Sequence, residues 1–344
     1  MKAAIYNPYW DTLGGGERYT AAFVKLLLYK GWQVDIHWPE NISAKIYNRF
    51  GIDISTVKFV SANPYPLSTI HYSLLFWLSD GSLPTSWAKK TVIHFQFPFK
   101  RVSGRRLPNL IKSRFYTFVA NSQFTKEVID QEFRVNCRVI YPPIDTAKFS
   151  AVKKTDTIIY VGRFSQLTQL KGYSLLIDVF KRISPHLPSW QLILAGGTTV
   201  GTAPGHLNQL RSRIRGLPVK IITNPEFGQL AELYSQAKIF WSASGFSADE
   251  KTDPTRTEHF GITVVESMAA GCVPVITNRG GHKEIVDHNR NGYLWNTPKQ
   301  LADYTLQIIK QPGKLENLSQ AAVQKSKIFD VSRFNHEFSR LLNL

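Results

Sequence analysis

The chain is 344 residues long, with 43% hydrophobic and 19% charged residues, a composition typical of a soluble globular protein with room for two domains. Its 42 Lys and Arg against 25 Asp and Glu give a formal net charge of +17, which favours an anionic partner such as a membrane surface or a nucleic acid. Two cysteines exclude a disulfide framework, and the apolar run 21–29, interrupted by Lys25, is too short to span a bilayer. Because residues 1–7 read directly into a strand, we expect no signal peptide and a cytoplasmic protein.

Short apolar runs alternate with helical patterns through the first half of the chain. Residues 2–7 predict a strand, a glycine-containing loop follows, residues 17–30 predict a helix, and residues 33–38 predict a second strand. This strand–helix–strand order is the unit of a doubly wound sheet. Further strands are expected at 57–60, 74–77, 91–95, 118–120 and 139–141, with a helix over 123–132 that Ser122 caps.

The second half of the chain repeats this alternation. Pro142 and Pro143 form a stiff dipeptide that marks the edge between the two domains. Strands that alternate with helices predict parallel sheets in both halves, and ligands of such sheets bind beyond the carboxyl ends of the strands. The strands are expected at 158–161, 191–195, 219–222, 239–242 and 273–277.

Two carboxylates eight residues apart, Glu258 and Glu266, flank the start of a helix that we predict over 263–270. Gly261 leaves backbone amides open to approach, and the N-terminus of a helix is a ready site for phosphate. Gly271 ends the helix. Carboxylates on either side of a phosphate can accept hydrogen bonds from hydroxyl groups, so the pattern predicts a nucleotide-sugar site, with sugar at Glu258 and ribose at Glu266.

Residues 258–271, E-H-F-G-I-T-V-V-E-S-M-A-A-G, resemble the E-x7-E motif of retaining glycosyltransferases of family 4. The residues of this motif are most similar to those of the branch of lipid-linked oligosaccharide mannosyltransferases and their bacterial relatives. The resemblance implies an α/β fold of the GT-B type, with two Rossmann-like doubly wound domains facing across a cleft. It also implies an acceptor-binding domain over 1–150, a nucleotide-sugar-binding domain over 151–325, and a C-terminal helix over 326–344 that crosses back to the first domain.

The same resemblance assigns roles to two cations. Gly162 and Arg163 directly follow a predicted strand, and Lys171 precedes a helix, so both cations can neutralise a diphosphate. The family has G-R-[LF] followed by K-G, and here the intervening residues 165–170 make a longer gap than usual, which leaves the placement of Lys171 open. Alternatively, both are surface charges.

The resemblance implies catalytic roles for Glu258, Arg163, Lys171 and His94, the last at a strand end where it can donate to a sugar hydroxyl. The alternative for His94 is a structural histidine. The implied donor-binding residues are Gly15, Gly16, Gly162, Arg163, Lys171, Gly196, His259, Phe260, Gly261, Ile262 and Glu266. The chain has no D-x-D motif and no His/Cys cluster, so we expect neither a metal nor a cofactor, with the nucleotide-sugar as substrate. The polar loop 244–257 is either mobile until the donor binds or a surface insertion.

The positive charge is concentrated in residues 81–126, which contain no Asp or Glu and interleave Lys and Arg with aromatic residues. Such a stretch suits an anionic membrane surface, which would place the protein peripherally on the inner face of the cytoplasmic membrane. A solvated basic face is the alternative, and nucleic acid is the least favoured partner. The residues expected at the membrane are Lys100, Arg101, Arg105, Arg106, Lys112 and Arg114.

The function that follows is transfer of a mannose- or glucose-type sugar, with retention, from UDP- or GDP-sugar to a lipid-linked or envelope glycan. The resemblance implies front-face departure of the diphosphate, whose own oxygen takes the acceptor proton. Two alternatives stay open on the same fold: a catalytically inactive partner subunit and a nucleotide-sugar epimerase.

Overall fold

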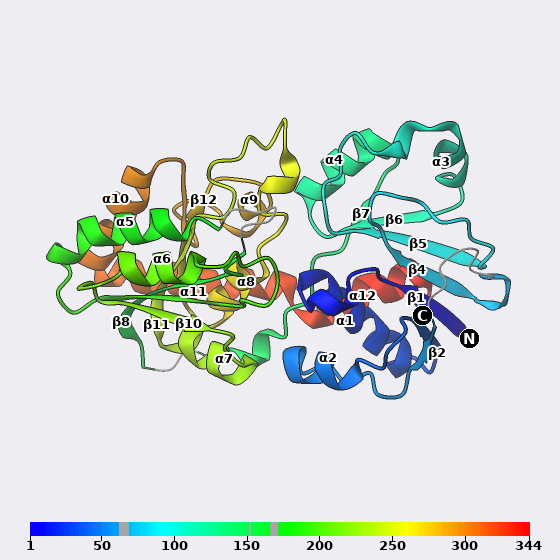
Figure 1. The fold of residues 1–344 in the computed structure, drawn as a ribbon, viewed down its shortest axis with the longest axis horizontal. Helices are drawn as coiled ribbons and strands as arrows, with labels where there is room; N and C mark the ends of the chain where they lie inside the picture. The colour runs from blue at the N-terminus through cyan, green and yellow to red at the C-terminus, as the bar shows by residue number, and fades with distance from the viewer. Residues whose placement is uncertain (62–68, 151–152, 166–170) are drawn as a thin grey trace. The chain divides into compact units, whose positions relative to one another are not determined.

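The computed structural model describes residues 1–61, 69–150, 153–165 and 171–344. The chain divides into two compact units (Figure 1). The first consists of Met1–Pro143 together with Val331–Leu344, and the second consists of Ile144–Asp330. Each unit contains one parallel sheet.

The sheet of the first unit has seven strands in the order β3-β2-β1-β4-β5-β6-β7, all parallel. The strands are β1 (Lys2–Tyr6), β2 (Gln33–His37), β3 (Lys58–Val60), β4 (Leu74–Leu78), β5 (Lys90–Phe95), β6 (Thr117–Ala120) and β7 (Arg138–Val139). The helices are α1 (Gly15–Tyr29), α2 (Ser43–Phe50), α3 (Leu107–Lys112), α4 (Gln123–Phe133) and α12 (Val331–Leu342). The strands expected from the sequence are confirmed to within a few residues, whereas α2 and α3 were not anticipated.

Helix α1 begins two residues before its predicted start, and Glu17 is the reason. The Glu17 carboxylate accepts hydrogen bonds from the Gly14 amide and the Thr12 hydroxyl, both at 2.7 Å, and so caps the first turn. This carboxyl is 3% exposed, and burial raises its pKa although the hydrogen bonds act in the opposite direction. The cap fixes the backbone of Gly15 and Gly16 as the first turn of α1.

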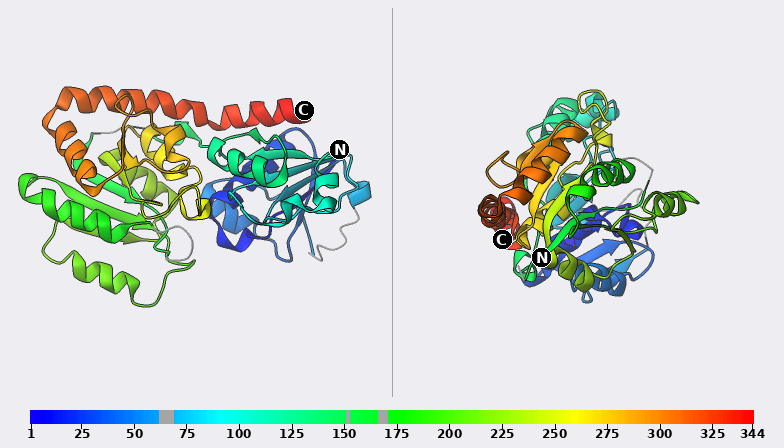
Figure 2. Two further views of the ribbon diagram at one scale, coloured as in Figure 1. Left: turned by 90° about the horizontal axis from the view of Figure 1, so that it is seen from above. Right: turned by 90° about the vertical axis from the view of Figure 1, so that its left-hand side faces the viewer.

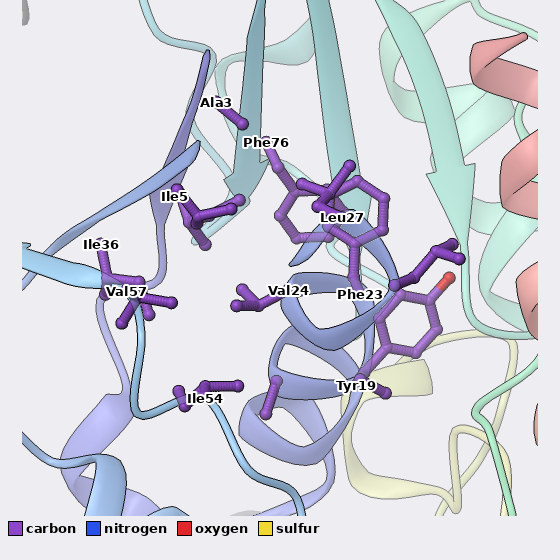
Figure 3. Close-up of a cluster of buried hydrophobic side chains, with 14 of the residues drawn as sticks. Ala3, Ile5, Tyr19, Phe23, Val24, Leu27, Ile36, Ile54, Val57 and Phe76 are labelled. Carbon is purple, nitrogen blue, oxygen red and sulfur yellow. The ribbon is translucent and has the colours of Figure 1, made fainter. Parts of the chain in front are cut away.

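One hydrophobic core of the first unit forms where α1 packs on the sheet, and another lies between β4, β5 and β6 and helix α4. Figure 3 shows Phe23 of α1 against Phe76 of β4, with ring centroids 4.5 Å apart. Helix α12, red in Figure 2, adds Phe338, whose ring lies 4.6 Å from that of Phe23. Phe334 of the same helix meets Tyr19 edge-on at 5.0 Å. The last helix of the chain therefore completes the core of the first unit.

The sheet of the second unit has six parallel strands in the order β10-β9-β8-β11-β12-β13. The strands are β8 (Thr155–Val161), β9 (Gln191–Gly196), β10 (Val219–Thr223), β11 (Ala237–Ser242), β12 (Val273–Thr277) and β13 (Tyr293–Trp295). The helices are α5 (Tyr173–Ile183), α6 (His206–Arg213), α7 (Phe227–Gln236), α8 (Ile262–Ala269), α9 (His282–Ile285), α10 (Pro298–Lys310) and α11 (Pro312–Ser326). Within the described residues, no helix combines the length and apolarity that a membrane-spanning segment requires.

The strand order of the second unit reverses next to β8. From β8 the chain proceeds through β9 to the edge strand β10, and it then returns to β11 on the other side of β8. Helices α5 and α6 consequently cover one face, and α7, α8 and α11 the other (Figure 2). A doubly wound sheet binds ligands at such a switch point, beyond the carboxyl ends of the two strands that flank it. Those ends are Val161 of β8 and Ser242 of β11.

Replacing Phe338 with Ala should lower the free energy of unfolding of the first unit by about 3–5 kcal/mol, because the fully buried ring contacts two other aromatic rings at α1 and β4. Thermal unfolding measured by calorimetry would report the loss. The matched control is Arg333→Ala on the exposed side of the same helix, which should change stability by less than about 0.5 kcal/mol. Equal stability of the two variants would show that α12 does not belong to the core.

Candidate functional site

The ends of three strands in the second unit, β8, β9 and β10, lie close together. A Cβ added to Gly196 would lie 1.6 Å from the Gly162 carbonyl oxygen, so no other residue fits at the end of β9. The Gly196 carbonyl oxygen accepts a hydrogen bond from the Asn224 amide at 2.8 Å, which joins β10 to the same point. The side chain of Asn224 also bonds the amide and the hydroxyl of Thr198, both at 2.9 Å, so main-chain and side-chain bonds together hold the loops after β8, β9 and β10 at one place.

Arg163 lies at this junction with its side chain exposed. Its neighbour Phe164 is buried and stacks on Tyr173 at 4.5 Å, and the Phe164 amide donates to the Gly197 carbonyl at 2.9 Å. The Tyr173 hydroxyl donates in turn to the Gly162 carbonyl oxygen. Arg163 is thus an exposed cation on an anchored segment. Of the long gap that follows it, residues 166–170 lie outside the described residues.

Lys171 and Glu258 form an ion pair with 2.8 Å between Nζ and Oε2. Their side chains are only 12% and 18% exposed, so solvent screens the pair weakly. Gly172 makes the approach possible, because it has a φ of +68° and a Cβ there would lie 2.6 Å from the Cβ of Ala243. The lysine, whose placement the sequence left open, is therefore brought to the end of β11.

The environment of Glu258 decides its charge. Burial alone would raise the pKa of this carboxyl, but Lys171, followed by His282 and His259, outweighs burial and lowers the pKa to about 2. Glu258 is consequently ionised at neutral pH and can accept hydrogen bonds but cannot donate a proton. This chemistry fits orientation of a hydroxyl-rich ligand.

Helix α8 begins just beyond Glu258. Gly261 caps it with a φ of +119°, and its carbonyl oxygen accepts from the amides of Val264 and Val265 at 3.0 and 3.3 Å. The segment before the helix is held by a side-chain contact, since His259 Nε2 lies 3.0 Å from the Thr255 carbonyl oxygen. The helix starts at Ile262, one residue before the predicted start, and ends at Ala269, with Gly271 at a positive φ of +79° as expected. Its first turn presents amides at the switch point.

Glu266 is placed on α8 and is 3% exposed. The Tyr234 hydroxyl of α7 donates to its Oε2 at 3.3 Å, a contact that nothing in the local sequence predicted. Phe260 is buried as well, with its ring 5.3 Å from that of Phe329.

His282, which helps to lower the pKa of Glu258, was not recognised in the sequence. Its Nδ1 lies 3.0 Å from the Thr277 hydroxyl, and the side chain is 1% exposed. Burial lowers its pKa to about 4 although Glu258 acts in the opposite direction, so the ring is neutral at pH 7. Glu284 lies in the first turn of α9, where a carboxylate interacts favourably with the helix dipole.

The residues predicted in the first unit lie at the carboxyl ends of β1 and β5. Gly15 and Gly16 open α1, and a Cβ on Gly16 would meet the Gln96 side chain at 3.5 Å. His94 is fully buried, stacks on Tyr19 at 3.8 Å, and has its Nε2 2.6 Å from the Gln96 amide nitrogen. Burial lowers its pKa to about 3, so His94 is neutral at pH 7. A role for His94 at a reacting carbon stays a prediction.

Among the residues that the structure describes, no three His, Cys, Asp or Glu side chains are grouped so that they could hold a metal ion. The expectation of a metal-free and cofactor-free protein stays a prediction.

Comparison with known proteins gives one family model, that of the glycosyl transferases group 1, which matches residues 143–325. A Dictyostelium discoideum protein named GDP-Man:Man(3)GlcNAc(2)-PP-Dol alpha-1,2-mannosyltransferase is 25% identical over 63% of this chain and 44% of its own length. Mannosylfructose-phosphate synthase of Agrobacterium fabrum is 24% identical over 91% of this chain and 61% of its own length. The chain spans about half the length of the curated relatives it matches.

Solved structures extend the likeness to the whole chain. A glycosyltransferase from Rickettsia africae has a TM-score of 0.75 and 17% identity, with 99% of this chain and 97% of that one covered. Anabaena HepE in complex with UDP-glucose has a TM-score of 0.73 and 18% identity over 100% of this chain and 99% of that one. At such identities the likeness establishes the fold, which extends through both units.

The variant Lys171→Met should raise the pKa of Glu258 above its ordinary value of 4.5, because burial then outweighs the remaining histidines. In the wild type the folded pKa of about 2 is depressed, so this carboxyl stabilises the fold above about pH 4.5 and loses that contribution as the pH falls through 2. At pH 7 the variant should lose about 1–3 kcal/mol of stability. NMR titration of labelled glutamate side chains would measure the pKa. The control is Lys220→Met, which removes an exposed lysine of β10. An unchanged pKa of Glu258 in the Lys171→Met variant would contradict the ion pair.

Proposed function

Because the chain belongs to the group 1 glycosyl transferases, we propose that it is a hexosyltransferase that moves a mannose- or glucose-type sugar from a nucleotide-sugar to a lipid-linked or envelope glycan. The Dictyostelium relative is named for a GDP-mannose donor and a dolichol-linked acceptor, and the Anabaena structure holds UDP-glucose. These names support both the donor class and the acceptor class of the proposal.

The observation that carries the proposal is the ion pair between Lys171 and Glu258 beside the start of α8. A nucleotide-sugar needs positive charge at its diphosphate and hydrogen-bond acceptors at its hydroxyl groups. Lys171 and the amides of α8 supply the first, and Arg163 adds a second cation. Glu258 would orient the sugar, and the buried Glu266 would hold the ribose.

In the proposed reaction the configuration of the anomeric carbon is retained. The bond between the anomeric carbon and the diphosphate oxygen breaks, the acceptor oxygen attacks from the same face, and a departing diphosphate oxygen takes the acceptor proton. Glu258 is paired with a lysine and ionised, so it would stabilise charge and orient the sugar. Arg163 and Lys171 would stabilise the charge that grows on the leaving diphosphate.

The two units would divide the substrates. The second unit would bind the donor, because the residues of the proposed site, from Gly162 to Glu266, follow the strands of its sheet. The first unit would bind the acceptor. There the first turn of α1, with Gly15 and Gly16, follows the carboxyl end of β1, and the pair His94 and Gln96 lies at the carboxyl end of β5, with β4 between the two strands.

The basic stretch would face an anionic membrane, where the lipid-linked acceptor resides. Arg101, Arg106 and Arg114 are exposed. Arg105 is exposed too, although its guanidinium donates to the Gln131 carbonyl at 3.1 Å. Lys112 is half-buried and donates to the Leu83 carbonyl at 3.3 Å, which joins α3 to the segment before Trp87.

Apolar side chains are exposed beside these cations. Trp87 is 71% exposed and Phe115 is 78% exposed. The Ser86 amide donates to the Tyr116 hydroxyl at 3.2 Å, so each of the two aromatic residues is adjacent in sequence to one partner of this hydrogen bond. Leu107 and Ile111 of α3 are 70% and 52% exposed. Cations next to exposed aromatic and aliphatic groups are the combination that binds an anionic bilayer surface. The protein would then lie peripherally on the inner face of the cytoplasmic membrane.

Titration with UDP and with GDP, without metal, should raise the unfolding midpoint with one of them. A ligand at a hundredfold excess over its Kd stabilises the folded state by about 2.7 kcal/mol. A rise with UDP or GDP identifies the donor class. No rise with either nucleotide would contradict the proposal and favour an inactive partner subunit.

Glu266→Ala should weaken nucleotide binding by roughly tenfold to a hundredfold, because it removes charge-assisted hydrogen bonds to the ribose. Glu258→Ala should instead lower kcat more than it lowers nucleotide affinity. Calorimetric titration and initial rates would measure the two effects, with Glu316→Ala on the exposed face of α11 as control. Equal losses of both properties in both variants would contradict this division of roles.

Replacing Arg101, Arg105 and Arg106 together with Ala should reduce binding to vesicles of anionic phospholipid, at about 1 kcal/mol for each lost cation, and leave nucleotide affinity unchanged. The control removes three exposed cations from the second unit: Arg211, Arg215 and Lys220. Sedimentation with anionic and with zwitterionic vesicles would separate charge-dependent binding from apolar binding. Equal vesicle binding by the two triple variants would refute a specific membrane face.

A further inference from the structure

The loop between β11 and Glu258 is closed at its base. Gly245 has a φ of +71°, and a Cβ there would lie 2.7 Å from the Cα of Thr257, so the two ends of the loop are in contact. Inside the loop the Asp253 amide donates to the Asp249 carbonyl at 2.9 Å, and the ring of Phe246 packs against Trp295 at 5.0 Å. The segment is thus a compact loop with contacts of its own.

Glu250, at the far side of this loop, is attached to the segment after β12. Its Oε2 accepts from the Gly280 amide at 2.8 Å, and its Oε1 pairs with Lys283 Nζ at 2.8 Å. The side chain is 27% exposed. Burial alone would raise its pKa, but the bonds from Lys283 and Gly280 outweigh burial and lower the pKa. The carboxylate is therefore charged at neutral pH and uses both oxygens.

The glycines held by Glu250 press against the main chain of Glu258. The Gly281 amide donates to the Glu258 carbonyl oxygen at 2.8 Å. Gly280 has a φ of +53°, and a Cβ there would lie 2.2 Å from the same oxygen, so only glycine permits this approach. These contacts form a closed ring. The Glu258 backbone contacts Gly281 and Gly280, Gly280 bonds Glu250, and the loop from Glu250 leads back to Glu258.

We propose that Glu250 is a positioning residue for Glu258: it holds the Gly280–Gly281 turn, and the turn fixes the backbone from which the Glu258 carboxylate reaches the sugar. This inference rests on the proposed function of Glu258. Glu250 itself touches neither substrate, because both of its oxygens are engaged with Gly280 and Lys283. The loop 244–257, for which the sequence offered two interpretations, is therefore a brace for Glu258.

The test compares three variants. Glu250→Ala should lower kcat about tenfold and change the donor KM and the nucleotide Kd less than twofold, since misplacement of a group that orients the reacting sugar acts on turnover. Glu250→Gln should recover part of the loss, because an amide oxygen can still accept from Gly280. The matched control is Asp249→Asn, an exposed carboxylate of the same loop whose Oδ1 accepts from the Lys251 amide, a bond that asparagine keeps. A loss in the control equal to that in Glu250→Ala would overturn the proposal.

A double-mutant cycle then distinguishes positioning from general damage. If Glu250 acts through Glu258, adding Glu250→Ala to Glu258→Gln should cost no further activity. A full tenfold loss in that background would overturn the proposal.

Amide hydrogen exchange keeps this test separate from the proposed function. In Glu250→Ala the backbone amides of Gly280 and Gly281 should exchange hydrogen at least tenfold faster than in the wild type. In Asp249→Asn the same two amides should exchange at the wild-type rate. If the wild type transfers no sugar, the proposed function fails and the exchange result alone decides whether Glu250 braces Glu258. Unchanged exchange in Glu250→Ala would overturn the proposal whatever the activity.

Discussion

The ion pair between Lys171 and Glu258 is the interaction on which the second unit's site depends. Each side chain is less than one-fifth exposed, and an ionised group at that depth is costly unless an opposite charge meets it. The loop after β8 and the segment after β11 must therefore come together at the point where the strand order reverses. Glycines at 172, 261 and 280 make that meeting sterically possible, since each takes a positive φ. The ion pair and the glycine backbone conformations thus both lie at the carboxyl ends of the two central strands, β8 and β11.

The pair also explains why the site needs further positive groups. Lys171 and Glu258 together carry no net charge, so by themselves they would not balance the diphosphate of the proposed donor. In the proposed site, the exposed Arg163 and the amides at the start of α8 would supply the remaining positive potential. Glu258, ionised and held between Lys171 and the Gly281 amide, is fixed before any ligand arrives. Preorganisation of this kind lowers the reorganisation that charge development would otherwise require.

Much of this could be predicted from the sequence, because strands of a parallel sheet are continuous apolar runs and the E-x7-E motif combines spacing with composition. The GT-B fold and the glycosyltransferase family are both confirmed. Local sequence patterns did not predict the elements and contacts that depend on tertiary structure. Helix α2 is only eight residues long and fully buries only Ile46, so its apolar pattern is short, and β13 is three residues long. The bonds from Tyr234 to Glu266 and from Gly280 to Glu250 join residues about 30 positions apart, and no periodicity reports them. The burial of His94 depends on α1, which lies far away in sequence.

The charges of this protein act in two physically different environments. The net charge of +17 comes from an excess of Lys and Arg, many of them exposed, such as Arg106 and Arg114, and their attraction to an anionic surface falls off over about 8 Å at physiological salt. Lys171 and Glu258 lie at 12% and 18% exposure, where counterions reach them poorly. Added salt should therefore weaken the proposed attachment to a membrane well before it disturbs the ion pair of the proposed donor site. The two properties can vary independently because one depends on long-range attraction at the surface and the other on contacts within the second unit.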